Sequence, residues 1–261
     1  MPSTRSHFRK LLSEAFNNLF PAVPYAPAES SESGDWAVEV KNLAVQIKSQ
    51  NSPVFSDVSF EIPVHCRTAL VGPNGSGKST LLKTLAGLVP YYSGEVKLFG
   101  SKPRLGRSRI AYLAQSPQLN PDFPLQLKRL VQMGTYAHHG WFEECHHADE
   151  KVASALKLLE LEDLVDRSVH NLSGGQLQRG LLARAAVQGA EILLLDEPYA
   201  ALDTKSREIV ENFLFHKDNS FTVIMATHET ADSKKFDRVL EINQGSLKTI
   251  HACLGHKNHH A

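Results

Sequence analysis

Residues 72–79 read Gly72-Pro-Asn-Gly-Ser-Gly-Lys-Ser79 and match the phosphate-binding pattern G-x-x-x-x-G-K-[ST] at every fixed position. The segment at 67–71, which ends in Ala69, Leu70 and Val71, predicts a buried strand before the loop, and spaced leucines predict a helix after it. These leucines are Leu81, Leu82, Leu85 and Leu88. Glycines let the backbone wrap around phosphate oxygens with its N–H groups inward, and the helix start also faces the anion. The stretch therefore predicts a strand–loop–helix unit that binds a nucleotide.

The residue types in this loop predict ATP and Mg²⁺ as ligands. Lys78 is expected to reach the β- and γ-phosphates, and Ser79 is expected to hold Mg²⁺. The full set of candidate nucleotide-binding residues here is Gly72, Pro73, Asn74, Gly75, Ser76, Gly77, Lys78, Ser79 and Thr80.

A second motif is the apolar run at 192–195 that ends in Asp196 and Glu197. Alone, it predicts only a strand closed by turn carboxylates. Beside a phosphate loop, Asp196 is the candidate Mg²⁺-positioning acid, and Glu197 is the candidate that orients or deprotonates the attacking water.

A third motif, Leu172-Ser-Gly-Gly-Gln176, lies shortly before that strand. Alone, it predicts a turn and a helix capped by Ser173. In this position it resembles the signature motif of the ATP-binding-cassette (ABC) ATPases, and the resemblance covers nearly all of residues 37–250. It implies an α/β fold: a P-loop NTPase ABC cassette with a mixed-sheet RecA-like core, an antiparallel β subdomain and an inserted α-helical subdomain.

Further motifs of this family occur in the expected order. Gln115 resembles the glutamine that senses the γ-phosphate and faces a membrane partner, the stretch from Ala201 to Asp203 resembles the D-loop, and His228 resembles the switch histidine. The resemblance implies Glu197, His228 and Gln115 as catalytic residues, and Ser79, Gln115 and Asp196 as the Mg²⁺ site. No internal repeat is seen, so the chain holds one cassette.

In this family the signature of one subunit closes over the ATP of another. The resemblance therefore implies a second ATPase subunit, identical or paralogous. The residues implied to complete the partner's site are Ser173, Gly174, Gly175, Gln176 and Asp203.

Composition limits the other classes of function. The chain has 261 residues with 28 Lys+Arg and 28 Asp+Glu, for a formal net charge of +0, so no nucleic-acid partner is expected. Three cysteines without a C-x-x-C pair argue against a disulfide scaffold or a zinc finger and fit a reducing cytoplasm. No run of roughly 18 apolar residues occurs, so membrane association is expected to be peripheral.

The pattern divides the chain into an N-terminal extension at 1–35, a cassette at 36–250 with a helical part at about 117–175, and a His-rich tail at 251–261. The extension reads as poorly ordered, or as a short amphipathic helix followed by a linker. The His-rich segments read as solvated histidines; the alternative is that the tail binds cytoplasmic metal and damps transport.

Two positions depart from the family pattern. Ile47 stands where an aromatic residue usually stacks on adenine, which lowers the expected base discrimination. His65 and Cys66 occupy a turn that normally carries a glycine. Neither change touches an expected phosphate or Mg²⁺ ligand.

The helical part resembles the ATPases of manganese, zinc and iron importers through the segments at 122–124, 133–136 and 140–142. This implies a membrane-spanning permease subunit, an extracytoplasmic metal-binding protein that acts indirectly, and a peripheral location on the cytoplasmic face of the inner membrane. The alternatives are an iron-chelate or cobalamin importer ATPase, a soluble ABC ATPase such as one for cluster assembly, and a regulator without turnover.

Overall fold

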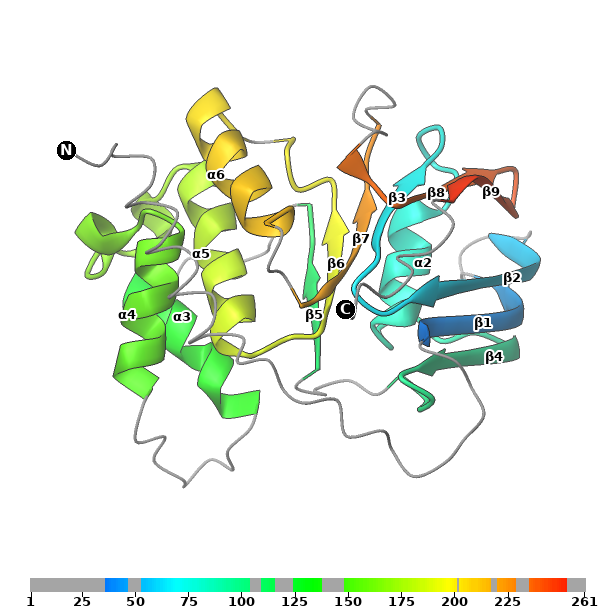
Figure 1. The fold of residues 1–261 in the computed structure, drawn as a ribbon, viewed down its shortest axis with the longest axis horizontal. Coiled ribbons are helices and arrows are strands. Elements are labelled where there is room, and N and C mark those ends of the chain that lie inside the picture. Colours follow the sequence, from blue (N-terminus) through cyan, green and yellow to red (C-terminus); the bar gives the residue numbers. More distant parts are fainter. Residues whose placement is uncertain are drawn as a thin grey trace, which may run out of the picture.

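The computed structural model describes residues 36–46, 53–103, 109–115, 124–137, 148–200, 202–216, 220–228 and 235–252. Within these residues the chain forms a six-stranded sheet, a three-stranded sheet and a group of helices to one side (Figure 1). Several predictions fall outside this part of the chain: those on residues 1–35, Ile47, segments 122–123 and 140–142, and most of the tail.

The large sheet has the strand order β5-β6-β7-β3-β8-β9. Its strands are β5 (Ile110–Leu113), β6 (Ile192–Asp196), β7 (Thr222–Ala226), β3 (Arg67–Val71), β8 (Arg238–Asn243) and β9 (Ser246–Ala252). All neighbours are parallel except β8 and β9. Every residue of β6 and β7 is buried, as expected for central parallel strands covered on both faces. The parallel strands therefore end at one common edge.

The small sheet is antiparallel, in the order β2-β1-β4. Its strands are β1 (Trp36–Val45), β2 (Phe55–Pro63) and β4 (Ser93–Leu98). Together with helix α2 (Lys78–Leu85), it encloses one hydrophobic core against one face of the large sheet. Alternate β6 residues, Ile192 and Leu194, point into this core.

The helices gather beside the opposite side of the large sheet in Figure 1 and share a second core with it. They are α3 (Leu127–Gln132), α4 (Ala148–Leu158), α5 (Gly174–Val187) and α6 (Thr204–Leu214), with short 3₁₀ turns at Met133–Ala137, Glu162–Leu164 and Val169–Asn171. Leu193 and Leu195, the other face of β6, pack here. The helix that follows the signature motif is thus anchored against the central sheet.

Two details differ from simple sequence patterns. Helix α2 ends at Leu85 because Gly87 takes a φ of 74°, so Leu88 lies beyond the helix and is 45% exposed. His65 has a φ of 59°, which explains the usual glycine at this turn. Its ring nitrogen Nδ1 lies 2.5 Å from the carbonyl oxygen of Ser220, which holds the turn in this conformation.

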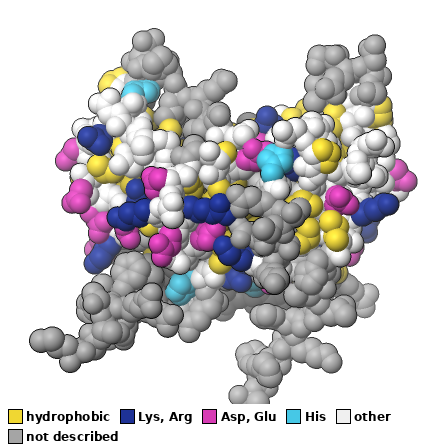
Figure 2. Space-filling view, turned by 90° about the horizontal axis from the view of Figure 1, so that it is seen from above, with side chains coloured by type: hydrophobic (Ala, Val, Ile, Leu, Met, Phe, Trp, Pro, Cys, Tyr) yellow, Lys and Arg dark blue, Asp and Glu magenta, His cyan; other side chains and the backbone are white. Residues whose placement is uncertain are grey.

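The described surface carries charges of both signs. On the face seen in Figure 2, basic and acidic side chains lie interspersed, in keeping with the balanced composition. None of the helices in the described part of the chain is long and apolar enough to cross a membrane.

Candidate active site

The candidate site lies where the parallel strands of the large sheet end. Each of these strands ends there in a segment of the site. Four of the segments were predicted: Gln115 after β5, Asp196 and Glu197 at β6, His228 after β7, and the phosphate loop after β3. The fifth segment, Gln244-Gly245 after β8, was not predicted. Ligands in open α/β sheets bind at this edge. The cavity has a volume of about 780 Å³ and is lined by Pro53, Val54, Asn74, Gly75, Ser76, Gly77, Lys78, Ser79, Thr80, Gln115, Glu197, His228, Gln244 and Gly245.

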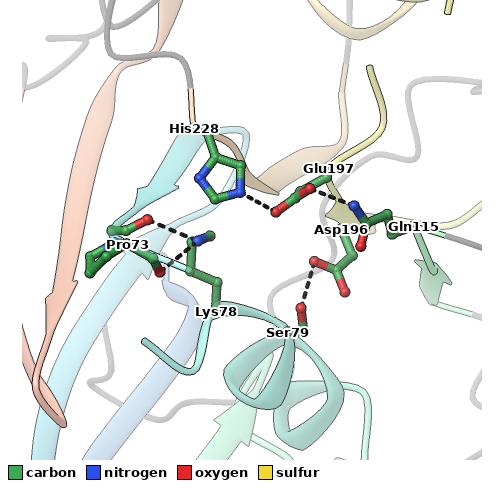
Figure 3. A network of polar contacts seen from close by, with 8 residues as sticks. Pro73, Lys78, Ser79, Gln115, Asp196, Glu197 and His228 are labelled. Carbon is green, nitrogen blue, oxygen red and sulfur yellow. Dashed lines mark hydrogen bonds and ion pairs between the residues drawn. The ribbon is translucent and has the colours of Figure 1, made fainter. Parts of the chain in front are cut away.

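The phosphate loop connects β3 to α2, and Lys78 begins the helix. The Lys78 ammonium donates hydrogen bonds to the carbonyl oxygens of Gly72 at 2.9 Å and Pro73 at 3.1 Å (Figure 3). Burial lowers the pKa of Lys78, while the carboxylates of Glu197 and Asp196 act in the opposite direction. The loop's own carbonyl groups thus hold a largely buried cation, since Lys78 is 5% exposed.

Asp196 is buried, being only 4% exposed. The Ser79 hydroxyl donates to its Oδ1 at 2.9 Å, and the Tyr112 hydroxyl donates to its Oδ2 at 3.3 Å. Burial, with the neighbouring Asp196 charge, raises the pKa of Tyr112, so the phenol keeps its proton. Both carboxylate oxygens therefore have hydroxyl partners.

Glu197 follows β6 in a left-handed conformation with a φ of 48°. Its backbone N–H donates to the carbonyl oxygen of Ala226 on β7, which fixes this bend. The Gln115 side-chain amide donates to Oε2 at 2.6 Å, and His228 Nε2 contacts Oε1. Figure 3 shows Gln115 and His228 on either side of this carboxylate. The three residues predicted as catalytic are thus in direct contact.

The groups present fit a nucleoside triphosphate with a hard divalent cation. The loop supplies the Lys78 cation and a helix start, and the buried Ser76 hydroxyl has no hydrogen-bond partner among the described residues. Ser79 and Asp196 place two oxygen atoms within 2.9 Å of each other. Oxygen is the donor that Mg²⁺ prefers.

The signature residues form a separate cluster. Ser173 caps α5: its hydroxyl accepts from the Gln176 backbone N–H, and the Gln176 side chain accepts from the Ser173 N–H. A Cβ on Gly175 would lie 2.8 Å from Ser206 Oγ, which requires a glycine here. Asp203 caps α6 by accepting from the Ser206 N–H at 2.7 Å, and this bond lowers the pKa of Asp203. None of the predicted signature or D-loop residues lies among the described residues that line the cavity.

The sequence reasoning missed Tyr112 and the far wall of the cavity formed by Pro53, Val54, Gln244 and Gly245. Tyr112 could have been found from its place three residues before Gln115 on a predicted strand. The other four follow or precede strands without any motif.

The sequence of this chain is similar to those of known proteins. The model of the ABC transporter family matches residues 55–200. The zinc transport system ATP-binding protein TroB of Treponema pallidum (strain Nichols) is 36% identical over 211 residues, which cover 80% of this chain and 79% of TroB. This chain belongs to the ABC transporter ATP-binding family. The manganese transport system ATP-binding protein MntB of Bacillus subtilis (strain 168) is 36% identical over 206 residues, covering 78% of this chain and 82% of MntB.

Solved structures agree with this membership of the ABC family. An inward-facing metal-chelate type ABC transporter gives a TM-score of 0.71 at 29% identity, covering 83% of each chain. A dimeric ATP-binding cassette bound to ADP and Pi gives a TM-score of 0.72 at 24% identity, covering 84% of this chain and 99% of that one, and it supports the fold alone. The predicted family, fold class and ATP hydrolase activity in a transport system are thereby confirmed.

Proposed function

We propose that this chain is the ATP-hydrolysing subunit that energises a membrane importer of a metal ion, namely manganese, zinc or iron. The observation that carries the cargo class is the 36% identity, over about four fifths of the chain, to ATP-binding proteins of zinc and manganese transport systems. The metal is the cargo and not a resident of the ATPase site.

Hydrolysis is assigned to the cavity at the strand ends. Lys78 and the loop N–H groups would hold the β- and γ-phosphates, and Glu197 would take a proton from the attacking water. The water oxygen bonds to the γ-phosphorus as the bond from that phosphorus to the β–γ bridging oxygen breaks, which releases ADP and phosphate. Each Glu197 oxygen has one partner here, Gln115 or His228, and each can accept a further hydrogen bond from the water.

Ser79 and Asp196 would hold Mg²⁺, with Gln115 as a third ligand. When bound, Mg²⁺ neutralises charge on the phosphate oxygens. Asp196 is preorganised for this role, because its Oδ1 already faces the Ser79 hydroxyl at 2.9 Å.

A second cassette would complete the site. The start of α5, with Ser173 to Gln176, is not among the described residues that line this chain's own cavity, and it would face the γ-phosphate held by the partner. Asp203 would lie at the same contact. ATP would thus join two cassettes, identical or paralogous, and hydrolysis would release them.

The partners follow from the proposed importer role. We place residues 36–250 as the ATPase domain, with its helical part at 117–175 carrying the motion to a permease, and 1–35 and 251–261 as extensions. The chain would be held peripherally at the cytoplasmic face of the membrane by the permease, and a metal-binding protein would act from the other side.

A second candidate is the ATPase of an iron-chelate or cobalamin importer. The 29% identity and TM-score of 0.71 to a metal-chelate type transporter favour keeping it. The two differ in cargo and share the same ATPase chemistry.

The test is ATPase activity of the chain reconstituted in lipid with the permease encoded beside it. Each candidate binding protein is added empty, metal-loaded or chelate-loaded. Stimulation by a protein loaded with manganese, zinc or iron supports the proposal, and stimulation only by a chelate supports the second candidate. Activity indifferent to permease and cargo would contradict both.

A further inference from the structure

Tyr112 lies on the same face of the large sheet as the proposed Mg²⁺ site. On the parallel pair β5–β6, Tyr112 is in register with Leu194. Side chains alternate along a strand, so Leu194 and Asp196 share one face, and Leu194 packs there against the leucines of α2. Tyr112 packs against the same core. Three separate elements, β5, β6 and α2, thus converge on one carboxylate.

The contacts give the two oxygens of Asp196 different partners. Ser79 Oγ, from α2, donates to Oδ1 at 2.9 Å, and the Tyr112 hydroxyl, from β5, donates to Oδ2 at 3.3 Å. Since Asp196 is 4% exposed, bulk water cannot easily replace either partner.

We propose that Tyr112 is a positioning residue for the magnesium site: its hydroxyl fixes Oδ2 of Asp196, so that Oδ1 stays directed at Ser79 and at the metal ion. Hydrogen-bond partners outside the ligand set orient carboxylate ligands in this way. The inference rests on the proposed function of Ser79 and Asp196 as Mg²⁺ ligands. It adds a residue that the sequence motifs do not contain.

The same segment also reaches the second acid. Three residues after Tyr112, the Gln115 amide donates to Glu197 at 2.6 Å. The segment from Tyr112 to Gln115 therefore contacts both neighbouring acids. Tyr112 contacts Asp196, the proposed metal ligand, and Gln115 contacts Glu197, the proposed base. The two contacts can therefore be tested separately. Loss of the Tyr112 hydroxyl should change metal binding at Asp196 while the contact between Gln115 and Glu197 is kept.

The test measures metal binding directly. The full chain is saturated with the non-hydrolysable analogue AMP-PNP, and Mn²⁺ is titrated as the probe, with free Mn²⁺ read by electron paramagnetic resonance. Tyr112→Phe removes only the hydroxyl, and Tyr92→Phe, at a side chain 61% exposed, is the matched control. We expect Tyr112→Phe to weaken Mn²⁺ binding by about 10-fold. Tyr92→Phe should leave it unchanged.

Further readouts separate positioning from general packing. AMP-PNP affinity in EDTA should be unchanged in Tyr112→Phe, and the Mg²⁺ concentration for half-maximal ATPase should rise while kcat at saturating Mg²⁺ is kept. Adding Tyr112→Phe to Asp196→Asn should cause no further loss of Mn²⁺ affinity.

Four results would overturn the inference. These are unchanged Mn²⁺ affinity in Tyr112→Phe, an equal loss of metal-free AMP-PNP binding, a lower kcat with an unaltered Mg²⁺ requirement, and a full additional loss in the double variant. If Asp196→Asn itself leaves Mn²⁺ affinity intact, the proposed metal site fails, and the inference fails with it. If Asp196→Asn loses Mn²⁺ affinity and Tyr112→Phe does not, the proposed function stands and only the positioning role of Tyr112 is rejected.

Discussion

Gly77, the last residue before α2, is a glycine whose replacement the structure penalises on two independent grounds. Its φ is 105°, which L residues with a side chain rarely adopt. An added Cβ would lie 2.6 Å from Phe55 Cζ and 2.8 Å from Val54 Cγ1. Phe55 is fully buried in the core beneath the loop, so it has little room to move.

The expected cost of Gly77→Ala is the sum of these effects. Forcing a left-handed conformation costs about 1–2 kcal/mol, and overpacking a core costs about 1–3 kcal/mol. The variant should therefore lose about 2–5 kcal/mol of unfolding free energy. Gly75→Ala is the matched control, because its φ of 77° carries a similar backbone cost and nothing lies within 4 Å of its Cβ. It should lose only about 1–2 kcal/mol.

The assay is urea unfolding followed by circular dichroism, with wild type and both variants measured in the same buffer without nucleotide. A lower midpoint for Gly77→Ala than for Gly75→Ala, with similar slopes, is the expected result. Equal midpoints for the two variants would refute the contact argument. Midpoints equal to wild type for both would also refute the backbone argument.

Three further predictions concern the catalytic base, the signature cap and a buried thiol. Glu197→Gln should reduce ATP hydrolysis by roughly 10²–10⁴-fold while ATP binding is kept, and near-normal turnover would remove Glu197 as the base. Ser173→Ala removes the acceptor of the Gln176 N–H, 3.2 Å away, and should lower unfolding free energy by about 1 kcal/mol; an unchanged denaturation midpoint would contradict this. Burial raises the pKa of the Cys66 thiol, so stability from this group is lost as pH rises above the pKa of the unfolded thiol. Alkylation of Cys66, followed by mass spectrometry, should begin at higher pH in the folded chain than in urea, and the same onset in both would be the contrary result.

Most of the candidate site residues that belong to sequence motifs could be predicted from the sequence. Most of the phosphate loop, together with Glu197, Gln115 and His228, carries residue types that chemistry restricts and lines one cavity. Asp196 lies beside that cavity, where it accepts from the Ser79 hydroxyl. Buried strands such as β6 could also be predicted, because burial on both faces requires a continuous apolar run.

Other features depend on tertiary placement and have no local signal. Tyr112 reaches Asp196 only because β5 and β6 are neighbours in register, a pairing that neither strand encodes by itself. Gln244 lines the cavity because β8 ends at the same edge as β3. The exit of Leu88 from α2 was set by Gly87, a local terminator that outweighed the leucine spacing.

If hydrolysis at Glu197 energises metal import, then metal uptake into vesicles should depend on this residue. Vesicles carrying the permease and this chain enclose ATP and Mg²⁺, with a binding protein loaded with radioactive manganese or zinc outside. We expect metal accumulation with wild type and background levels with Glu197→Gln. Equal accumulation by wild type and Glu197→Gln, or none with any metal while ATP is hydrolysed, would contradict it.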